Sequence, residues 1–121
     1  LVLPLGPVSE QSLASAYLEC DVTVIPSRFE SFGLVSIESL LMGTPVVSTP
    51  TGIMPELISD GVNGSLYEPG QTEMLANKIE GILRAQSATG RNEKSPLISI
   101  DKYGKPEREI DDIVGVYSEL T

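Results

Sequence analysis

The sequence contains no histidine and no tryptophan, and its only cysteine is Cys20. Without histidine, the chain lacks the commonest general acid–base catalyst and the commonest metal ligand. A single cysteine cannot form an internal disulfide, so nothing indicates an oxidising compartment. We expect Cys20 to be a small core residue. These absences argue against a complete enzyme within 121 residues.

Basic residues are scarce as well. The chain has 8 Lys and Arg against 17 Asp and Glu, which gives a formal net charge of −9. Nucleic acids and anionic membrane surfaces both require a basic footprint, so the charge argues against either partner. A phosphorylated small molecule stays open as a ligand, because amides at a helix N-terminus bind phosphate without side-chain charge. The sequence also has no apolar run long enough to cross a bilayer.

Apolar segments of strand type alternate with segments of helical periodicity. Strands are expected at residues 1–5, 22–25, 45–48 and 65–67. Helices are expected after Ser9 and after Thr72, both good N-cap residues, and between Gly33 and Gly43. Three apolar stripes mark helix faces: Leu13, Ala16, Tyr17 and Cys20; Leu75, Ile79, Ile82 and Leu83; and Ile110, Ile113, Val114, Tyr117 and Leu120. Residues 86–106 are polar and receive no assignment. This alternation predicts an α/β fold with a parallel sheet.

Ligands of such sheets bind beyond the carboxyl ends of the strands. The loop at residues 27–33 is the best candidate there, since Gly33 at a helix entrance lets the backbone approach a diphosphate. Glu30 lies on this loop, and Glu38 lies just over one turn into the helix that follows it. An ionised carboxylate can accept hydrogen bonds from two adjacent hydroxyls, as in a ribose diol.

Plainer interpretations stand beside this one. Glu38 can be a solvated residue of an amphipathic helix, and Glu30 an ordinary loop acid. Arg28 can be a surface charge rather than a phosphate ligand. Phe29 and Phe32 can be packing groups rather than stacking groups. The residue types alone leave both interpretations open.

The order of residues favours the ligand site. Residues 26–40, PSRFESFGLVSIESL, and then 43–47, GTPVV, resemble the signature of the group 1 (family 4) retaining glycosyltransferases. Residues 20–22, CDV, and 60–64, DGVNG, resemble further parts of that signature. The resemblance runs from about Gly6 to Leu83 in the family's order and spacing.

This resemblance implies a Rossmann-like parallel sheet with flanking helices, as part of the C-terminal domain of a GT-B enzyme. It implies that residues 1–121 are one truncated domain, without the N-terminal acceptor domain and the first strands. The reaction implied is transfer of a hexose with retention, without metal or organic cofactor. The donor would be a UDP-, GDP- or ADP-linked sugar, and the acceptor a carbohydrate or a lipid-linked molecule. We expect polysaccharide synthesis in the cytoplasm or at the inner face of the membrane, and an inactive isolated fragment.

The resemblance also assigns roles to residues. Glu30 would be the catalytic residue that touches the transferred sugar, and Glu38 would bind the ribose. The remaining donor-binding positions would be Ser31, Phe32, Gly33, Leu34 and Val35, whose amides contact sugar and diphosphate. Two departures weaken the assignment: residues 51–56, TGIMPE, lack the family's paired glycine, and its basic diphosphate ligands lie upstream of Leu1.

Other functions remain as hypotheses. A non-catalytic module that binds a nucleotide sugar or a partner chain is the main alternative. Sugar-nucleotide 2-epimerases share the GT-B shape but have a paired glycine and adjacent acids that residues 29–34 do not reproduce. A response regulator needs clustered acids after its first strand, and residues 3–7 have none.

The family's strand order, 3-2-1-4-5-6, yields a topological prediction. Residues 1–5 would be the third strand and residues 22–25 the fourth, so the two strands between them would be missing. Residues 22–25 would then be a bare sheet edge that favours self-association, unless residues 1–5 pair with it directly.

Overall fold

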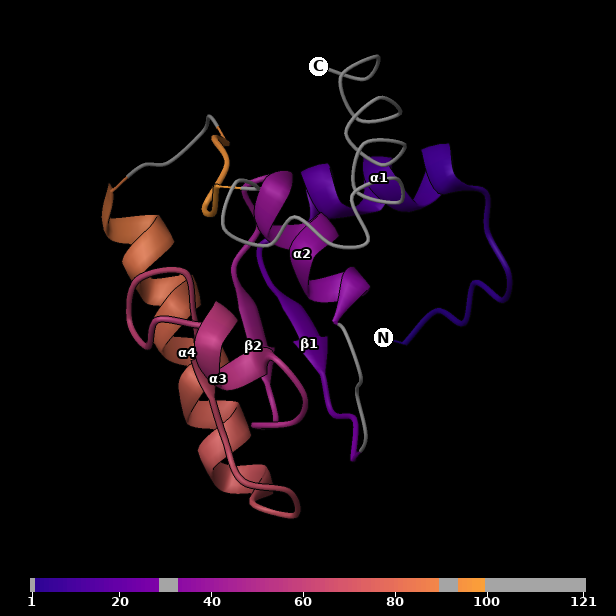
Figure 1. Cartoon of the computed structure of the whole chain (residues 1–121). Helices are drawn as coiled ribbons and strands as arrows, with labels where there is room; N and C mark the ends of the chain where they lie inside the picture. The colour runs from indigo at the N-terminus through magenta and orange to yellow at the C-terminus, as the bar shows by residue number, and fades with distance from the viewer. Residues whose placement is uncertain (1, 29–32, 90–93, 100–121) are drawn as a thin grey trace.

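The computed structural model describes residues 2–28, 33–89 and 94–99 (Figure 1). The elements follow in the order α1 (Glu10–Glu19), β1 (Thr23–Ile25), α2 (Leu34–Leu41), β2 (Val46–Ser48), α3 (Met54–Leu57), β3 (Gly64–Leu66) and α4 (Thr72–Thr89). The three expected strands after residue 20 are therefore present, each shifted or shortened by about one residue. The alternation of strands and helices confirms the α/β class.

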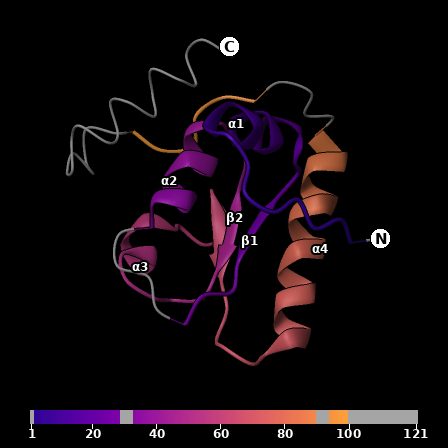
Figure 2. The same cartoon turned by 90° about the vertical axis from the view of Figure 1, so that its right-hand side faces the viewer.

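The sheet has the order β1-β2-β3, and both strand pairs are parallel. Thr23 lies opposite Val46, and Val46 lies opposite Gly64. Figure 2 shows the layers: α2 and α3 cover one face of the sheet, and α4 covers the other. This arrangement is Rossmann-like, with helices on both faces of a parallel sheet.

The core lies between the sheet and the layer formed by α2 and α3. Side chains alternate between the faces of a strand, so Ile25, Val46 and Leu66 point to the same layer. They pack with fully buried residues of α2 and α3, namely Ile37, Leu40, Met54 and Leu57. Ser39 is also buried, and its hydroxyl donates to the Thr44 carbonyl at 2.9 Å. This face therefore has the density and the satisfied polar groups of a protein interior.

The opposite face is more open. Val47 is fully buried beneath α4, but no residue of α4 itself is buried. Of its expected stripe, Leu75, Ile79 and Ile82 are half-buried and Leu83 is 38% exposed. α4 also continues to Thr89, into a segment that the sequence left unassigned.

The expected strand at residues 1–5 is wrong over residues 2–5, which form no regular structure. Val2, Leu3 and Leu5 are 87%, 70% and 72% exposed. A strand needs a neighbouring strand to pair its peptide groups. In the family's strand order that neighbour is the second strand, which is absent from the residues described. Pro4 also has no N–H to donate. In the described part of the chain β1 pairs only with β2, so the expectation of an unpaired edge there is confirmed.

Two further expectations need correction. Cys20 is exposed and is the C-cap of α1, whereas Ala14 and Tyr17 are the buried residues of that helix. The prediction that Cys20 lies in the core is wrong because the helix ends at Glu19 and the backbone of Cys20 is extended. α3 was not anticipated, since its four residues follow a turn-rich segment. The expected helix at residues 110–120 lies outside the described residues.

Candidate functional site: the start of α2

Three chain segments leave the carboxyl ends of the strands at one edge of the sheet (Figure 1). They run from Ile25, Ser48 and Leu66 towards the starts of α2, α3 and α4. Two of them are tied together: the Thr49 amide donates to the Ile25 carbonyl at 3.3 Å, and the Thr49 hydroxyl donates to the Ser27 carbonyl. This edge is where a parallel α/β sheet binds its ligand.

Gly33 is the N-cap of α2 and has a left-handed backbone, with φ 74° and ψ 37°. A β-carbon at this position would lie 2.2 Å from Cε of Met54. The first turn of α2 is further joined to α3 by Ser36, whose hydroxyl lies 3.1 Å from the Met54 sulfur. The left-handed backbone thus favours glycine, and a β-carbon there would also force the Met54 methyl group to move.

The start of α2 differs from the other described helix starts in charge. α1 is capped by the Ser9 hydroxyl and has Glu10 in its first turn. α3 and α4 have Glu56 and Glu73 in their first turns. α2 has no acidic residue in its first turn and no side-chain cap. Within this first turn no carboxylate therefore offsets the positive potential of the leading amides.

The seven residues assigned from the sequence divide into two groups. Glu30, Ser31 and Phe32 lie outside the described residues. Gly33, Leu34 and Val35 form the start of α2. Gly33 is buried, Leu34 is half-buried and Val35 is 44% exposed. Glu38 is half-buried one turn further on.

Glu38 contacts a residue that the sequence assigned only to the core. The Tyr17 hydroxyl donates to Oε2 of Glu38 at 3.2 Å, across the contact between α1 and α2. Burial raises the pKa of Tyr17 well above its usual range, and the negative charge of Glu38 raises it further. Tyr17 therefore stays protonated and remains a donor to the Glu38 carboxylate.

The signal for this contact was present in the sequence. Tyr17 lies on an apolar helix face, and a buried tyrosine hydroxyl usually finds a polar partner. Glu38 is the only charged residue of the helix LVSIESLL. What the sequence did not supply was the packing of α1 on α2 that brings the two together.

The segment between β2 and α3 contains the departure from the family's paired glycine. Its Thr51 hydroxyl is buried and has no hydrogen-bond partner among the described residues. Ile53 follows, and its Cγ1 would lie 3.4 Å from a β-carbon at Gly33. The side chains of Ile53 and Met54 therefore lie directly beside the Gly33 backbone.

The DGVNG turn at residues 60–64 has a structural role. Asn63 is buried, its Nδ2 donates to the Leu57 carbonyl at 3.1 Å, and its Oδ1 accepts from the Ser59 amide at 2.8 Å. A β-carbon at Gly64 would lie 1.9 Å from the Val46 carbonyl oxygen. Close approach of β3 to β2 therefore requires glycine, and the motif needs no ligand to explain it.

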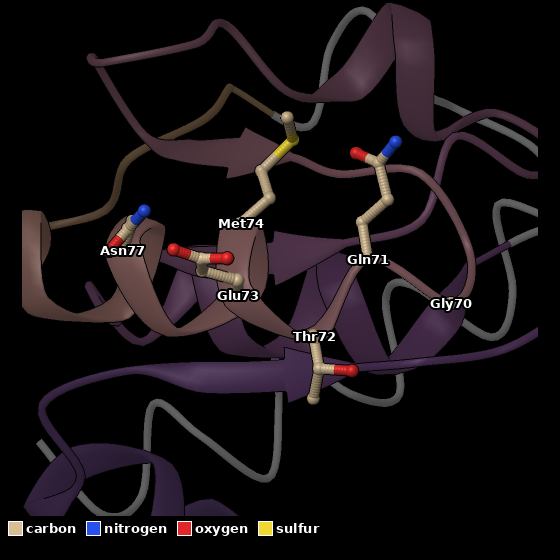
Figure 3. Close-up of a pocket in the computed structure, with 6 residues that line it drawn as sticks. All are labelled: Gly70, Gln71, Thr72, Glu73, Met74 and Asn77. Atoms are coloured by element: carbon tan, nitrogen blue, oxygen red, sulfur yellow. The ribbon is translucent and has the colours of Figure 1, made fainter.

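A hollow lies at the start of α4, at the same edge of the sheet (Figure 3). Its lining includes Gln71, Thr72 and Met74, and the Thr72 side chain points away from the other two. The Glu73 carboxylate also lines it, and none of the lining residues is basic. The hollow is a poor site for a diphosphate, because a carboxylate in the first turn opposes an anion.

Metal and membrane features were sought in the described part of the chain. No group of three or more acidic or cysteine side chains there could hold a metal ion. None of the described helices is long and apolar enough to cross a membrane.

Comparison with known proteins identifies the family. Residues 2–110 match the family model of the glycosyl transferases group 1. The chain belongs to this family. The C-terminal domain of the GT-B fold, expected from the sequence, is confirmed by this match together with the parallel sheet.

Individual relatives agree with the family match. The chain is 40% identical over 83 residues to a D-inositol 3-phosphate glycosyltransferase of Mycobacterium marinum, covering 69% of this chain and 18% of that protein. It is 39% identical over 89 residues to an uncharacterised 41.2 kDa protein in the cps region of Klebsiella pneumoniae, covering 74% of this chain and 24% of that protein. The chain thus spans about a fifth of the length of the curated relatives that it matches. Family match and relatives together show a sequence of the group 1 glycosyl transferases.

Proposed function

We propose that this chain is the donor-binding part of a longer, two-domain retaining glycosyltransferase, and that the start of α2 binds the nucleotide sugar. The observation that carries the proposal is the combination of an uncapped, acid-free first turn with a carboxylate one turn further on, at Glu38. The amides suit a diphosphate and the carboxylate suits a ribose diol. The other described helix starts lack this combination.

The proposed roles follow the chemistry of the donor. Amides at residues 32–35 contact sugar and diphosphate, Glu38 accepts from the ribose hydroxyls, and Glu30 touches the transferred hexose. Glu30 stabilises the positive charge that develops at the anomeric carbon, so its contacts tighten in the transition state. The bond from the anomeric carbon to the diphosphate oxygen breaks as the acceptor oxygen bonds to that carbon from the same face, and the hydroxyl proton passes to the departing diphosphate, so the configuration is retained. Neither Glu30 nor Glu38 requires a metal for these roles.

The donor is proposed to be a UDP-, GDP- or ADP-linked sugar, and the acceptor a carbohydrate or a lipid-linked molecule. The mycobacterial relatives are named as glycosyltransferases of D-inositol 3-phosphate, and transfer to a small polar hydroxyl compound fits the same proposal. On the same family grounds, we propose that the full-length enzyme acts in the cytoplasm, in polysaccharide synthesis.

Two substitutions in the full-length protein test the assignment. Glu38→Ala should weaken donor binding on the order of 10- to 100-fold, since charge-assisted hydrogen bonds contribute about 1.5–3 kcal/mol each. Glu30→Ala should instead lower kcat with a smaller effect on donor affinity. Donor Kd by calorimetry and kcat by initial rates separate the two effects.

Glu80→Ala is the matched control, because Glu80 is an exposed acid of α4 paired with Arg84 at its surface. It should leave both quantities unchanged. Unchanged donor affinity in Glu38→Ala would refute the ribose assignment. Donor binding without any turnover in the wild-type full-length protein would support the non-catalytic binding module instead.

A further inference from the structure

Tyr17 is 5% exposed, and it packs with Ala14 and Met42 in a small cluster between α1 and α2. Its hydroxyl nevertheless reaches out of this apolar cluster to Oε2 of Glu38, at 3.2 Å. Glu38 is half-buried, so this hydrogen bond lies at the boundary between the core and the site. The tyrosine ring thus extends from the interior to Glu38, the residue proposed to bind the ribose.

The other end of Tyr17 is held as well. Its main-chain carbonyl accepts from the Thr44 hydroxyl and, at 2.8 Å, from the Lys94 ammonium. Lys94 also donates to the Thr44 hydroxyl oxygen at 2.7 Å and to the Cys20 carbonyl. Backbone and ring of Tyr17 are therefore both fixed, which makes its hydroxyl a rigid donor rather than a mobile one.

A carboxylate offers about four acceptor positions on its two oxygens. The bond from Tyr17 uses one of them on Oε2, so this bond does not by itself prevent the carboxylate from accepting from a diol. A free glutamate side chain must lose rotational freedom when it grips a ligand, whereas a carboxylate already held in place loses less. Burial and the negative charge of Glu38 both raise the pKa of Tyr17, so its hydroxyl keeps its proton and remains a donor to the Glu38 carboxylate.

We infer that Tyr17 is a positioning residue of the donor site, which holds the Glu38 carboxylate in the orientation that accepts from the ribose hydroxyls. This inference rests on the proposed function, because it needs Glu38 to be the ribose ligand. Tyr17 itself touches no substrate. Its contribution is specific to the hydroxyls that Glu38 accepts from, which distinguishes it from a general contribution to stability.

The test compares two ligands in the full-length protein. Calorimetry first identifies which of UDP, GDP and ADP binds most tightly. The same measurement with its 2′,3′-dideoxy analogue then gives the ratio of the two Kd values, which reports the ribose hydroxyls alone. Wild type, Tyr17→Phe and Glu38→Gln are compared by this ratio.

Tyr17→Phe should reduce the preference for the ribose form about two- to tenfold, because the Glu38 side chain would then have to be ordered on binding. The Kd of the dideoxy analogue should stay unchanged. Glu38→Gln should reduce the preference further. Tyr67→Phe is the control, since Tyr67 is a tyrosine of similar burial, at 6% exposed. It should keep the wild-type ratio.

An unchanged ratio in Tyr17→Phe, or equal weakening of both ligands, would overturn the inference while leaving the role of Glu38 intact. An unchanged ratio in Glu38→Gln would refute the proposed ribose ligand itself and the inference with it.

Discussion

α2 and α4 lie on opposite faces of the same sheet and have different environments. α2 has eight residues, four of which are buried, and its first turn is free of acids and side-chain caps. α4 has 18 residues, none of them buried, and has Glu73 in its first turn. The shorter helix thus contributes more to the core, and its first turn lacks the carboxylate that α4 has. Helix length alone would have ranked the two the other way round.

The comparison locates the rigid part of the domain. Buried side chains of α2 fill the space against β1, β2 and α3, so the start of α2 is held from several sides. Preorganised amides are worth more to a ligand than mobile ones. α4 is held mainly through half-buried side chains over β2, and we expect its removal or alteration to cost less.

The largest expected difference concerns core truncation. Leu40→Ala removes a fully buried side chain of α2, whereas Leu83→Ala removes a side chain of α4 that is 38% exposed. Leu40→Ala should lower the free energy of unfolding by about 2–5 kcal/mol, because it leaves a cavity in a packed core. Leu83→Ala should lower it by less than about 1 kcal/mol. Urea denaturation measures both, and equal losses would contradict the contrast between the two faces.

Replacing glycine by alanine should change the free energy of unfolding in opposite directions at the two helices. Gly33→Ala forces a side chain onto a backbone with φ 74° and onto Met54. We expect a loss of about 1–3 kcal/mol. Gly81→Ala lies within α4, where a β-carbon would meet nothing within 4 Å. A gain of about 0.5–1 kcal/mol is expected there, since alanine favours the helix.

Thermal denaturation of these two variants checks the signs. A stabilising Gly33→Ala substitution would show that the left-handed start of α2 is not maintained in solution. A destabilising Gly81→Ala substitution would show that α4 has a partner at that position.

A smaller effect is expected at high pH, from the contact between Tyr17 and Glu38. The folded protein holds the Tyr17 proton above its usual pKa, whereas the unfolded chain releases it above about pH 10. The unfolded state then binds fewer protons, so this contribution to stability falls as pH rises above 10. The slope is at most about 1.4 kcal/mol per pH unit.

Tyr17→Phe removes this component, so its stability should depend less on pH between about 10 and 12 than that of the wild type. Urea denaturation series at several pH values measure the difference between the two proteins. Parallel curves for wild type and variant would mean that Tyr17 titrates alike in the folded and unfolded states.

The sequence predicted most of this architecture because local signals and packing agreed. Continuous apolar runs of strand type gave β1 and β2, and Gly43 marked the end of α2 correctly. Prediction failed where the outcome depended on neighbours outside the segment. Residues 2–5 have a strand-like composition but no adjacent strand, and Cys20 continues an apolar stripe beyond the end of its helix.

The candidate site was predictable in part for the same reason. Gly33 at a helix start follows from a loop-to-helix pattern that is local in sequence, whereas the role of Glu38 came from the resemblance to the family. The contact from Tyr17 to Glu38 joins residues 21 positions apart, and the contact of Gly33 with Met54 depends on the packing of a helix that the sequence did not indicate. Such contacts require the tertiary arrangement, which periodicity does not supply.

Amide hydrogen exchange tests the central claim most directly, because it compares the starts of α2 and α4 in one experiment. The full-length protein would be measured with and without a saturating nucleoside diphosphate chosen from UDP, GDP and ADP. The account predicts added protection at residues 33–36, at the start of α2, and none at residues 72–75, at the start of α4. Protection at residues 72–75 with no change at residues 33–36 would contradict it and would place the anion on the other face of the sheet.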